Sequence, residues 1–257
     1  MLRDKIMGMV ETAARRMGTS TRPSIRKFAA TEGTANPANP LAEIFYAHEG
    51  RTVHKWTHYP DIYHRHFEPR RGTNIRLLEL GVFKGGSLEM WRKYFGPEAT
   101  IFGIDIEPKC AGYVDEPNRV RIGSQADGEF LQSVVAEMGG LDVVIDDGSH
   151  KASHQRASFK ALFPLLADGG LYLIEDTHTS YWPGFTEGGY RRKGTAIEFA
   201  KSLIDDMHGH YHFRRNGLAR DWIPAIHFYD SMIVIEKAWR ERPSHIQVGG
   251  HHAVTAP

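Results

Sequence analysis

Between residues 75 and 176 the chain alternates short, continuously apolar segments with longer amphipathic ones. The apolar segments lack the polar alternation of a strand with one face in solvent; they span 75–80, 100–106, 141–146 and 171–176. Segments with helical spacing lie between them, at 86–96, 127–140 and 154–170. Parallel strands buried on both faces have this composition, and each needs a crossover to reach the next. The pattern therefore predicts an α/β fold with a doubly wound, Rossmann-like sheet.

Three further strands complete the predicted sheet. A short one is predicted at 119–124, within the alternating region. The other two follow a predicted helix at 195–209 and are the apolar segments 223–230 and 232–237. Too few residues separate these last two segments for a crossover, so they should form an antiparallel hairpin. The predicted sheet therefore has seven strands and includes a C-terminal antiparallel hairpin.

The region ahead of the sheet is predicted to be partly helical. Apolar residues at helical spacing predict an amphipathic N-terminal helix; they are Leu2, Ile6, Met9, Ala13 and Met17. A stretch rich in Ser, Thr, Ala, Asn and Pro follows, and two short helices are predicted at 41–50 and 59–67. We therefore divide the chain into an N-terminal helix and extended arm, residues 1–40, and one domain, residues 41–257.

Composition argues against several classes of protein. The 257 residues include 32 basic and 31 acidic ones, so no basic excess indicates nucleic-acid binding. No apolar stretch approaches the roughly 20 residues that span a membrane, and the N-terminus lacks the apolar core of a secretory signal. Cys110 is the one cysteine, so no internal disulfide can form. We therefore expect a cytoplasmic protein with no membrane span and no nucleic-acid partner.

The first predicted strand leads into a glycine-rich loop, "LELGVFKGGS". In such sheets ligands bind beyond the carboxyl ends of the strands. Gly81, Gly85 and Gly86 would let the backbone approach a ligand closely, and Asp105 ends the next strand, where it can accept hydrogen bonds from ribose hydroxyls. The spacing differs from G-x-G-x-x-G, so the pyrophosphate fingerprint of a dinucleotide site is absent. By itself the loop is equally compatible with packing glycines and a helix-capping aspartate.

Four carboxylates are predicted to meet at one edge of the sheet. Asp146 and Asp147 end the fourth strand, while Glu175 and Asp176 end the fifth. If these strands are neighbours, their ends lie about 5 Å apart. Uncompensated carboxylates would repel and raise one another's pKa values, and a divalent cation removes that conflict. Oxygen ligands favour a hard ion such as Mg²⁺.

Two alternatives stay open for this acidic cluster. Asp147 precedes a predicted helix and could cap it, although capping would leave the second acidic pair unexplained. Zinc is less favoured without a cysteine, although His150 and His154 could share a helical face.

The glycine loop, Asp105 and the terminal hairpin together resemble the class I S-adenosylmethionine-dependent methyltransferases. The resemblance implies that the start of the loop lies near the methionine part of the cofactor, Asp105 at the ribose and residues 124–127 by the adenine. Asp146 is expected to face the charged methionine end, and the segment 55–63 to close over the cofactor from the other side, with Tyr59 or Tyr63 nearest. The expected cofactor contacts are therefore Glu79, Gly81, Gly85, Ser87, Asp105, Ser124, Gln125, Asp127, Asp146 and Tyr63.

Three motifs resemble a narrower family, the metal-dependent sugar O-methyltransferases of macrolide biosynthesis and their actinobacterial relatives acting on rhamnosyl or mannosyl groups. The motifs are "KWTHYPDIYHRHFEPRRG", "IDDGSH" and "IEDTHTSYW", and the likeness covers about residues 41–240. It implies S-adenosylmethionine and Mg²⁺ as cofactors, with Asp147, Glu175 and Asp176 as metal ligands and His150 as general base. Residues 1–40 stay without an assigned role, and a homo-oligomer is expected.

The expected reaction is methylation of a sugar hydroxyl on a small glycoside. Mg²⁺ would lower the pKa of the hydroxyl, and His150 would accept its proton. Tyr181 and Trp182 would stack on the sugar or anchor their own loop, with His178 beside them on the substrate side. A catechol-type O-methyltransferase is the first alternative, since it needs the same metal geometry but commonly uses a lysine base. A nicotinamide-dependent oxidoreductase and a non-catalytic binding protein fit less well.

Overall fold

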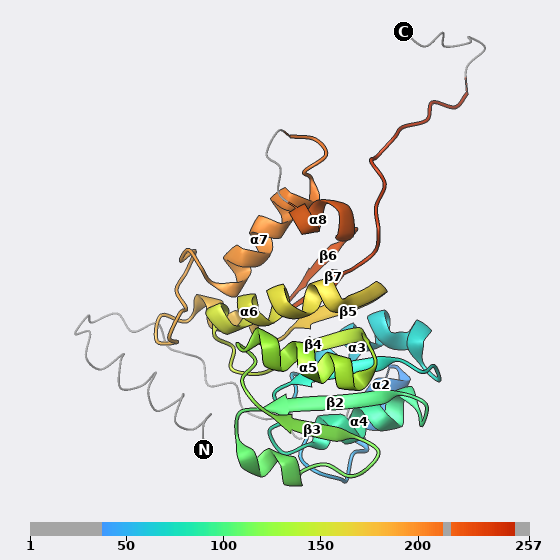
Figure 1. Ribbon diagram of the computed structural model, residues 1–257, viewed down its shortest axis with the longest axis vertical. Coiled ribbons are helices and arrows are strands. Elements are labelled where there is room, and N and C mark those ends of the chain that lie inside the picture. The colour runs from blue at the N-terminus through green and yellow to red at the C-terminus, as the bar shows by residue number, and fades with distance from the viewer. Residues whose placement is uncertain (1–37, 213–216, 250–257) are drawn as a thin grey trace.

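The computed structural model describes residues 38–212 and 217–249 (Figure 1). The predicted N-terminal helix and most of the arm lie outside the described residues. At the centre is a seven-stranded sheet in the order β3-β2-β1-β4-β5-β7-β6. The strands are β1 (Arg76–Leu80), β2 (Thr100–Asp105), β3 (Arg119–Ile122), β4 (Leu141–Asp146), β5 (Leu166–Ile174), β6 (Ile226–Tyr229) and β7 (Met232–Glu236). β1 to β5 are parallel, and β7 pairs antiparallel with both β5 and β6, which confirms the predicted fold class.

Helices cover both faces of the sheet (Figure 1). They are α2 (Pro40–Tyr46), α3 (Tyr59–Phe67), α4 (Gly86–Phe95), α5 (Gly128–Met138), α6 (Ala152–Leu162), α7 (Ala196–Met207) and α8 (Gly217–Trp222). One buried apolar cluster joins the sheet to α2, α3 and α4, and a second joins it to α5, α6 and α7. None of the described helices is long and apolar enough to cross a membrane.

The alternation of side chains along each strand decides which helical layer a residue faces. Val143 and Ile145 of β4 pack in the cluster with α3 and α4, whereas Val144 packs in the cluster with α5 and α6. The same alternation directs Asp147 toward the α3–α4 layer and Asp146 toward the α5–α6 layer. The two adjacent aspartates therefore belong to different faces of the sheet.

Some boundaries differ from the predictions. β5 begins at Leu166, five residues before the predicted strand, because Leu166 pairs with Leu141 ahead of a register shift in β4. α6 ends at Leu162 and a 3-10 turn with Pro164 follows, so the predicted helix is too long. Helix α8 had no counterpart in the sequence analysis. At the N-terminal side Asn39 caps α2 and donates to Asp61 of α3, which ties it to the domain predicted to begin at residue 41.

Candidate active site

Three of the four predicted carboxylates, Asp147, Glu175 and Asp176, meet at the carboxyl ends of the strands, and a buried lysine lies beside them. Lys55 Nζ donates to Asp147 Oδ2 at 2.8 Å and to Glu175 Oε2 at 2.9 Å, and it lies 3.6 Å from Glu79 Oε1. Its side chain is 2% exposed. Burial alone would lower the pKa of Lys55, but the charges of these three carboxylates raise it well above its ordinary value. Lys55 is therefore a fixed cation where the sequence predicts a metal ion.

Glu175 and Glu79 form the deepest part of this cluster. Burial raises the pKa of Glu175, and the neighbouring charge of Asp147 adds to the effect. Burial likewise raises the pKa of Glu79, whose Oε2 accepts a hydrogen bond of 2.6 Å from Ser87. The second oxygen of Glu79 is buried and has no hydrogen-bond partner. A buried acceptor without a hydrogen bond is costly, and the charge of Lys55 at 3.6 Å from this oxygen offsets part of that cost.

Tyr63 and Ser87, which were both expected to contact the cofactor, each donate a hydrogen bond to one of the two buried glutamates. Tyr63 is fully buried on α3, and its hydroxyl donates to Glu175 Oε1. Tyr63 thus orients the Glu175 carboxylate, and its expected contact with the cofactor stays a prediction. Ser87 lies in the first turn of α4 and holds Glu79.

A second group of potential ligands lies beside the lysine. Asp147, His150 and Asp176 each offer a ligand atom, and these atoms lie within 4.8 Å of one another. His150 Nε2 is 3.6 Å from Asp176 Oδ2 and 3.9 Å from Asp147 Oδ1, and its buried Nδ1 has no hydrogen-bond partner. Carboxylate oxygens and an imidazole at this spacing suit a divalent cation. The oxygen donors of Asp147 and Asp176 fit the predicted Mg²⁺, while His150 stands in this group where the sequence predicts Glu175.

Backbone strain accompanies these functional side chains. His150 and Asp176 have φ values of 55° and 52°, in the left-handed region. Holding a residue other than glycine there costs on the order of 1–3 kcal/mol, and only a firmly packed surrounding maintains it. His150 lies two residues ahead of α6, not on the helix as predicted. Lys151 takes the N-cap position of α6, so Asp147 does not cap that helix.

The segment ahead of α3 forms one wall of the site. Trp56 Nε1 donates to Asp176 Oδ1 at 3.0 Å, and the Tyr59 hydroxyl lies 3.1 Å from the same oxygen. The His178 ring packs edge-on against Trp56 and Trp182, with ring centroids 5.3 and 4.6 Å away. This segment was predicted to lie near the cofactor, but Lys55 and Trp56 were not among the predicted site residues. The available signal for Lys55 was a lysine within a recognised motif, because converging carboxylates require positive charge.

Asp146 faces the α5–α6 layer, and its predicted place near the methionine end of the cofactor stays a prediction. Its Oδ1 accepts from Gln125 Nε2 at 2.9 Å, and its Oδ2 accepts from Ser158 Oγ at 2.6 Å, with the Tyr172 hydroxyl at 3.3 Å. Burial raises the pKa of Asp146. Gln125 Oε1 in turn accepts from the Ser149 N–H at 2.7 Å, so Asp146 and Gln125 fix the loop that carries His150.

The loop glycines serve close packing of the chain on itself. Gly81 has φ +97°, and a Cβ there would collide with the carbonyl oxygen of Asp147. Gly85 has φ +80°, and a Cβ there would collide with the carbonyl oxygen of Tyr113. Both positions therefore require glycine for reasons of structure. Their predicted approach to a cofactor stays a prediction.

Asp105 joins the end of β2 to the glycine loop. Its Oδ2 accepts from the Val82 and Phe83 N–H groups at 3.0 and 3.1 Å, and its Oδ1 accepts from the Glu107 N–H at 2.9 Å. Phe83 adopts φ 54° and is, after His150 and Asp176, the third residue other than glycine with a positive φ near the site. Asp105 thus lies where a ribose is expected, and its role as a ribose ligand stays a prediction.

The remaining predicted residues lie at the rim. Ser124 Oγ accepts from the Ala126 N–H, and Asp127 caps α5 through the N–H groups of residues 129 and 130. Tyr181 is 45% exposed, which leaves it free to meet a substrate, whereas Trp182 is partly buried beside His178. Whether Tyr181 and Trp182 stack on a sugar or anchor their own loop stays open as a prediction.

Comparisons with known proteins agree with this geometry. Residues 78–177 match the family model for a methyltransferase domain. The chain is 41% identical to 8-demethyl-8-(2-methoxy-alpha-L-rhamnosyl)-tetracenomycin-C 3'-O-methyltransferase of Streptomyces olivaceus, over 79% of this chain and 55% of that protein. It is 42% identical to mycinamicin VI 2''-O-methyltransferase of Micromonospora griseorubida, over 68% of this chain and 47% of that protein.

A solved structure of a methyltransferase is also similar to this chain. The MycE methyltransferase of the mycinamycin biosynthetic pathway, in complex with Mg, SAH and mycinamycin VI, has a TM-score of 0.71 and 36% sequence identity. The match covers 79% of this chain and 55% of that one. The chain thus spans about half the length of the curated relatives it matches.

Proposed function

The chain belongs to the class I S-adenosylmethionine-dependent methyltransferases, and from this premise we propose that it methylates a sugar hydroxyl with the help of a divalent cation. The observation that carries the proposal is that Asp147 and Asp176, two predicted metal ligands, lie with their ligand atoms within 4.8 Å of each other and of a ring nitrogen of His150, the predicted base. The names of the relatives support a glycoside acceptor, because they describe methylation of rhamnosyl, olivosyl and macrolide sugars.

Asp147, Glu175 and Asp176 are the residues that would hold the metal. Asp147 and Asp176 face the shared space, and His150 borders it. Glu175 accepts hydrogen bonds from Lys55 and Tyr63, so it could bind the metal only if Lys55 released one or both of its hydrogen bonds to Glu175. Bound Mg²⁺ supplies Lewis acidity that lowers the pKa of a coordinated hydroxyl, and S-adenosylmethionine supplies the electrophilic methyl group.

His150 is placed to accept the proton of the sugar hydroxyl. Its Nε2 lies 3.9 Å from Asp147 Oδ1 and 3.6 Å from Asp176 Oδ2, beside the space where the metal and the hydroxyl would bind. The left-handed backbone at His150 and the loop fixed by Gln125 hold the ring in this place. A base within reach of its proton contributes about 10²- to 10⁴-fold in rate.

Lys55 acts in this proposal as a structural cation. Its contacts with Asp147, Glu175 and Glu79 raise its pKa, so it stays protonated and cannot accept a proton near neutral pH. Lys55 therefore does not favour the catechol-type alternative, which would use a lysine as the base.

A methyl-transfer assay with labelled S-adenosylmethionine over a panel of rhamnosides, mannosides and macrolide glycosides tests the proposal. We expect transfer to a sugar, abolished by EDTA and restored by Mg²⁺. Transfer to a catechol in preference to every sugar, or full activity after exhaustive chelation, would overturn it. Sedimentation of the same preparation tests the predicted homo-oligomer.

A further inference from the structure

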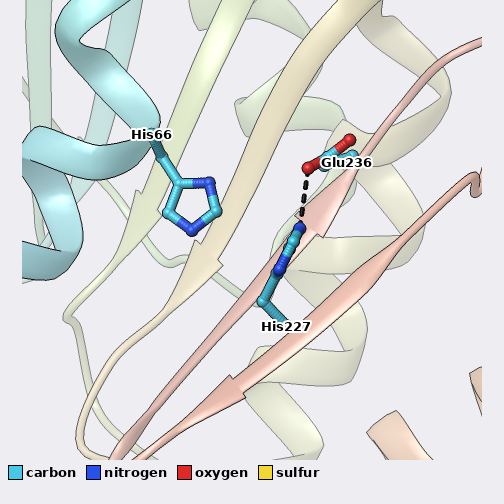
Figure 2. Close-up of side chains that lie close together, drawn as sticks. All are labelled: His66, His227 and Glu236. Carbon is cyan, nitrogen blue, oxygen red and sulfur yellow. Dashed lines mark hydrogen bonds and ion pairs between the residues drawn. The ribbon is translucent and has the colours of Figure 1, made fainter.

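A second group of metal-ligating side chains lies away from the candidate active site, where α3 meets the β6–β7 hairpin. The group is His66, His227 and Glu236 (Figure 2), and their ligand atoms lie within 4.8 Å of one another. His227 Nε2 is 2.7 Å from Glu236 Oε1, and the rings of His66 and His227 have centroids 4.8 Å apart. We call these three residues the edge triad.

Strand register explains why the edge triad forms. His227 lies opposite Val234 in the hairpin, so His227 and Glu236 project from the same face as Val234. Val234 packs in the apolar cluster that contains α3. The hairpin pair is therefore directed toward the helix that carries His66, as Figure 2 shows.

We propose that the edge triad binds a divalent transition-metal ion of the zinc class. Two imidazoles and one carboxylate are a ligand set that zinc accepts, with water in the fourth position. Mg²⁺ prefers oxygen ligands, so it should favour the carboxylates at Asp147 and Asp176. The two sites would therefore select different ions, and this inference does not rest on the proposed methyl transfer.

A hydrogen bond with a neighbouring side chain fixes the orientation of the His66 ring. Its Nε2 is hydrogen-bonded with the Tyr229 hydroxyl at 2.9 Å, which orients the ring and leaves the other ring nitrogen for a metal.

A metal at the edge triad would clamp α3 to the hairpin. Tyr59, seven residues before His66 and thus about 10 Å along the helix axis, lies beside Asp176 and contacts Ser231 in the hairpin turn. Tyr63, between them, holds Glu175. The ion would thus fix the helix that positions two carboxylates of the candidate active site.

The test is a calorimetric titration of the chelator-treated full chain with Zn²⁺ in the presence of saturating Mg²⁺, with Co²⁺ absorption as a check on coordination by nitrogen. We expect one Zn²⁺ per chain and a rise in Tm on binding. His227→Gln and Glu236→Gln should each lose most of the affinity, and Tyr229→Phe should lose about 10- to 100-fold as an outer partner. Because the His227 side chain is 36% exposed, its replacement should leave the fold intact.

Two controls keep the result specific. His64→Gln alters a histidine on the same helix that pairs with Tyr94, and it should leave Zn²⁺ affinity unchanged. His150→Gln should also leave it unchanged. Absence of Zn²⁺ binding in the wild type would overturn the proposal. So would unchanged affinity in folded His227→Gln and Glu236→Gln, or loss of affinity in His150→Gln alone.

Discussion

Replacing Lys55 with methionine removes the positive charge from the carboxylate cluster and keeps the length of the side chain. Lys55 is fully buried and lies within 3.6 Å of carboxylates on three strand ends. Removing one partner of a buried ion pair costs about 3–5 kcal/mol. For a chain of this size each kcal/mol lowers Tm by about 2–4 °C, so we expect a fall of about 6–20 °C.

The loss of stability should depend on pH with a defined sign. Burial already raises the pKa values of Glu175 and Glu79, and loss of the lysine removes a charge that lowers them. A carboxyl with a raised folded pKa contributes its stability in the protonated form, and that stability is lost as pH rises through the folded pKa. The difference between wild type and Lys55→Met should therefore grow from acidic to alkaline pH.

Thermal unfolding with and without Mg²⁺ measures both effects. Mg²⁺ should stabilise Lys55→Met more than the wild type, since the lysine charge opposes binding of a cation to the same carboxylates. The matched control is Lys201→Met, which removes a lysine that is 49% exposed and pairs with Glu198, and should change stability by at most about 0.5 kcal/mol. An equal Tm for the two variants, or an equal response to Mg²⁺ in variant and wild type, would refute the reasoning.

Three further substitutions separate the roles at the site. His150→Gln should lower kcat by about 10²- to 10⁴-fold and leave S-adenosylhomocysteine affinity nearly unchanged; recovery of the rate with excess Mg²⁺ would instead make His150 a metal ligand. Asp105→Ala should weaken S-adenosylhomocysteine binding in calorimetry, and unchanged affinity would remove Asp105 from the cofactor site. Asp146→Asn should destabilise the fold by about 1–3 kcal/mol through its contacts with Gln125 and Ser158, while Mg²⁺ affinity stays the same; a large loss of Mg²⁺ affinity would show that Asp146 is a ligand after all.

The sheet could be predicted from the sequence because strands buried on both faces are continuously apolar. The meeting of their carboxyl ends could be predicted because the strands are parallel neighbours. The sequence was also sufficient to place Asp147 and Asp176 side by side. The orientation of Asp146 was predictable too, since alternation along β4 assigns it to the layer of Val144. Lys55 was not predictable from local pattern, because its carboxylate partners lie 92 and 120 residues further along the chain.

That separation has a consequence for how the protein is made. Lys55 leaves the ribosome well before Glu175, and at about 5–20 residues per second the intervening 120 residues take roughly 6–24 s to synthesise. Throughout this interval Lys55 and Trp56 lack the strand end that they finally contact. Loop-closure entropy also delays contacts between such distant segments. The wall formed by residues 55–63 should therefore be among the last parts of the domain to gain protection from hydrogen exchange during folding.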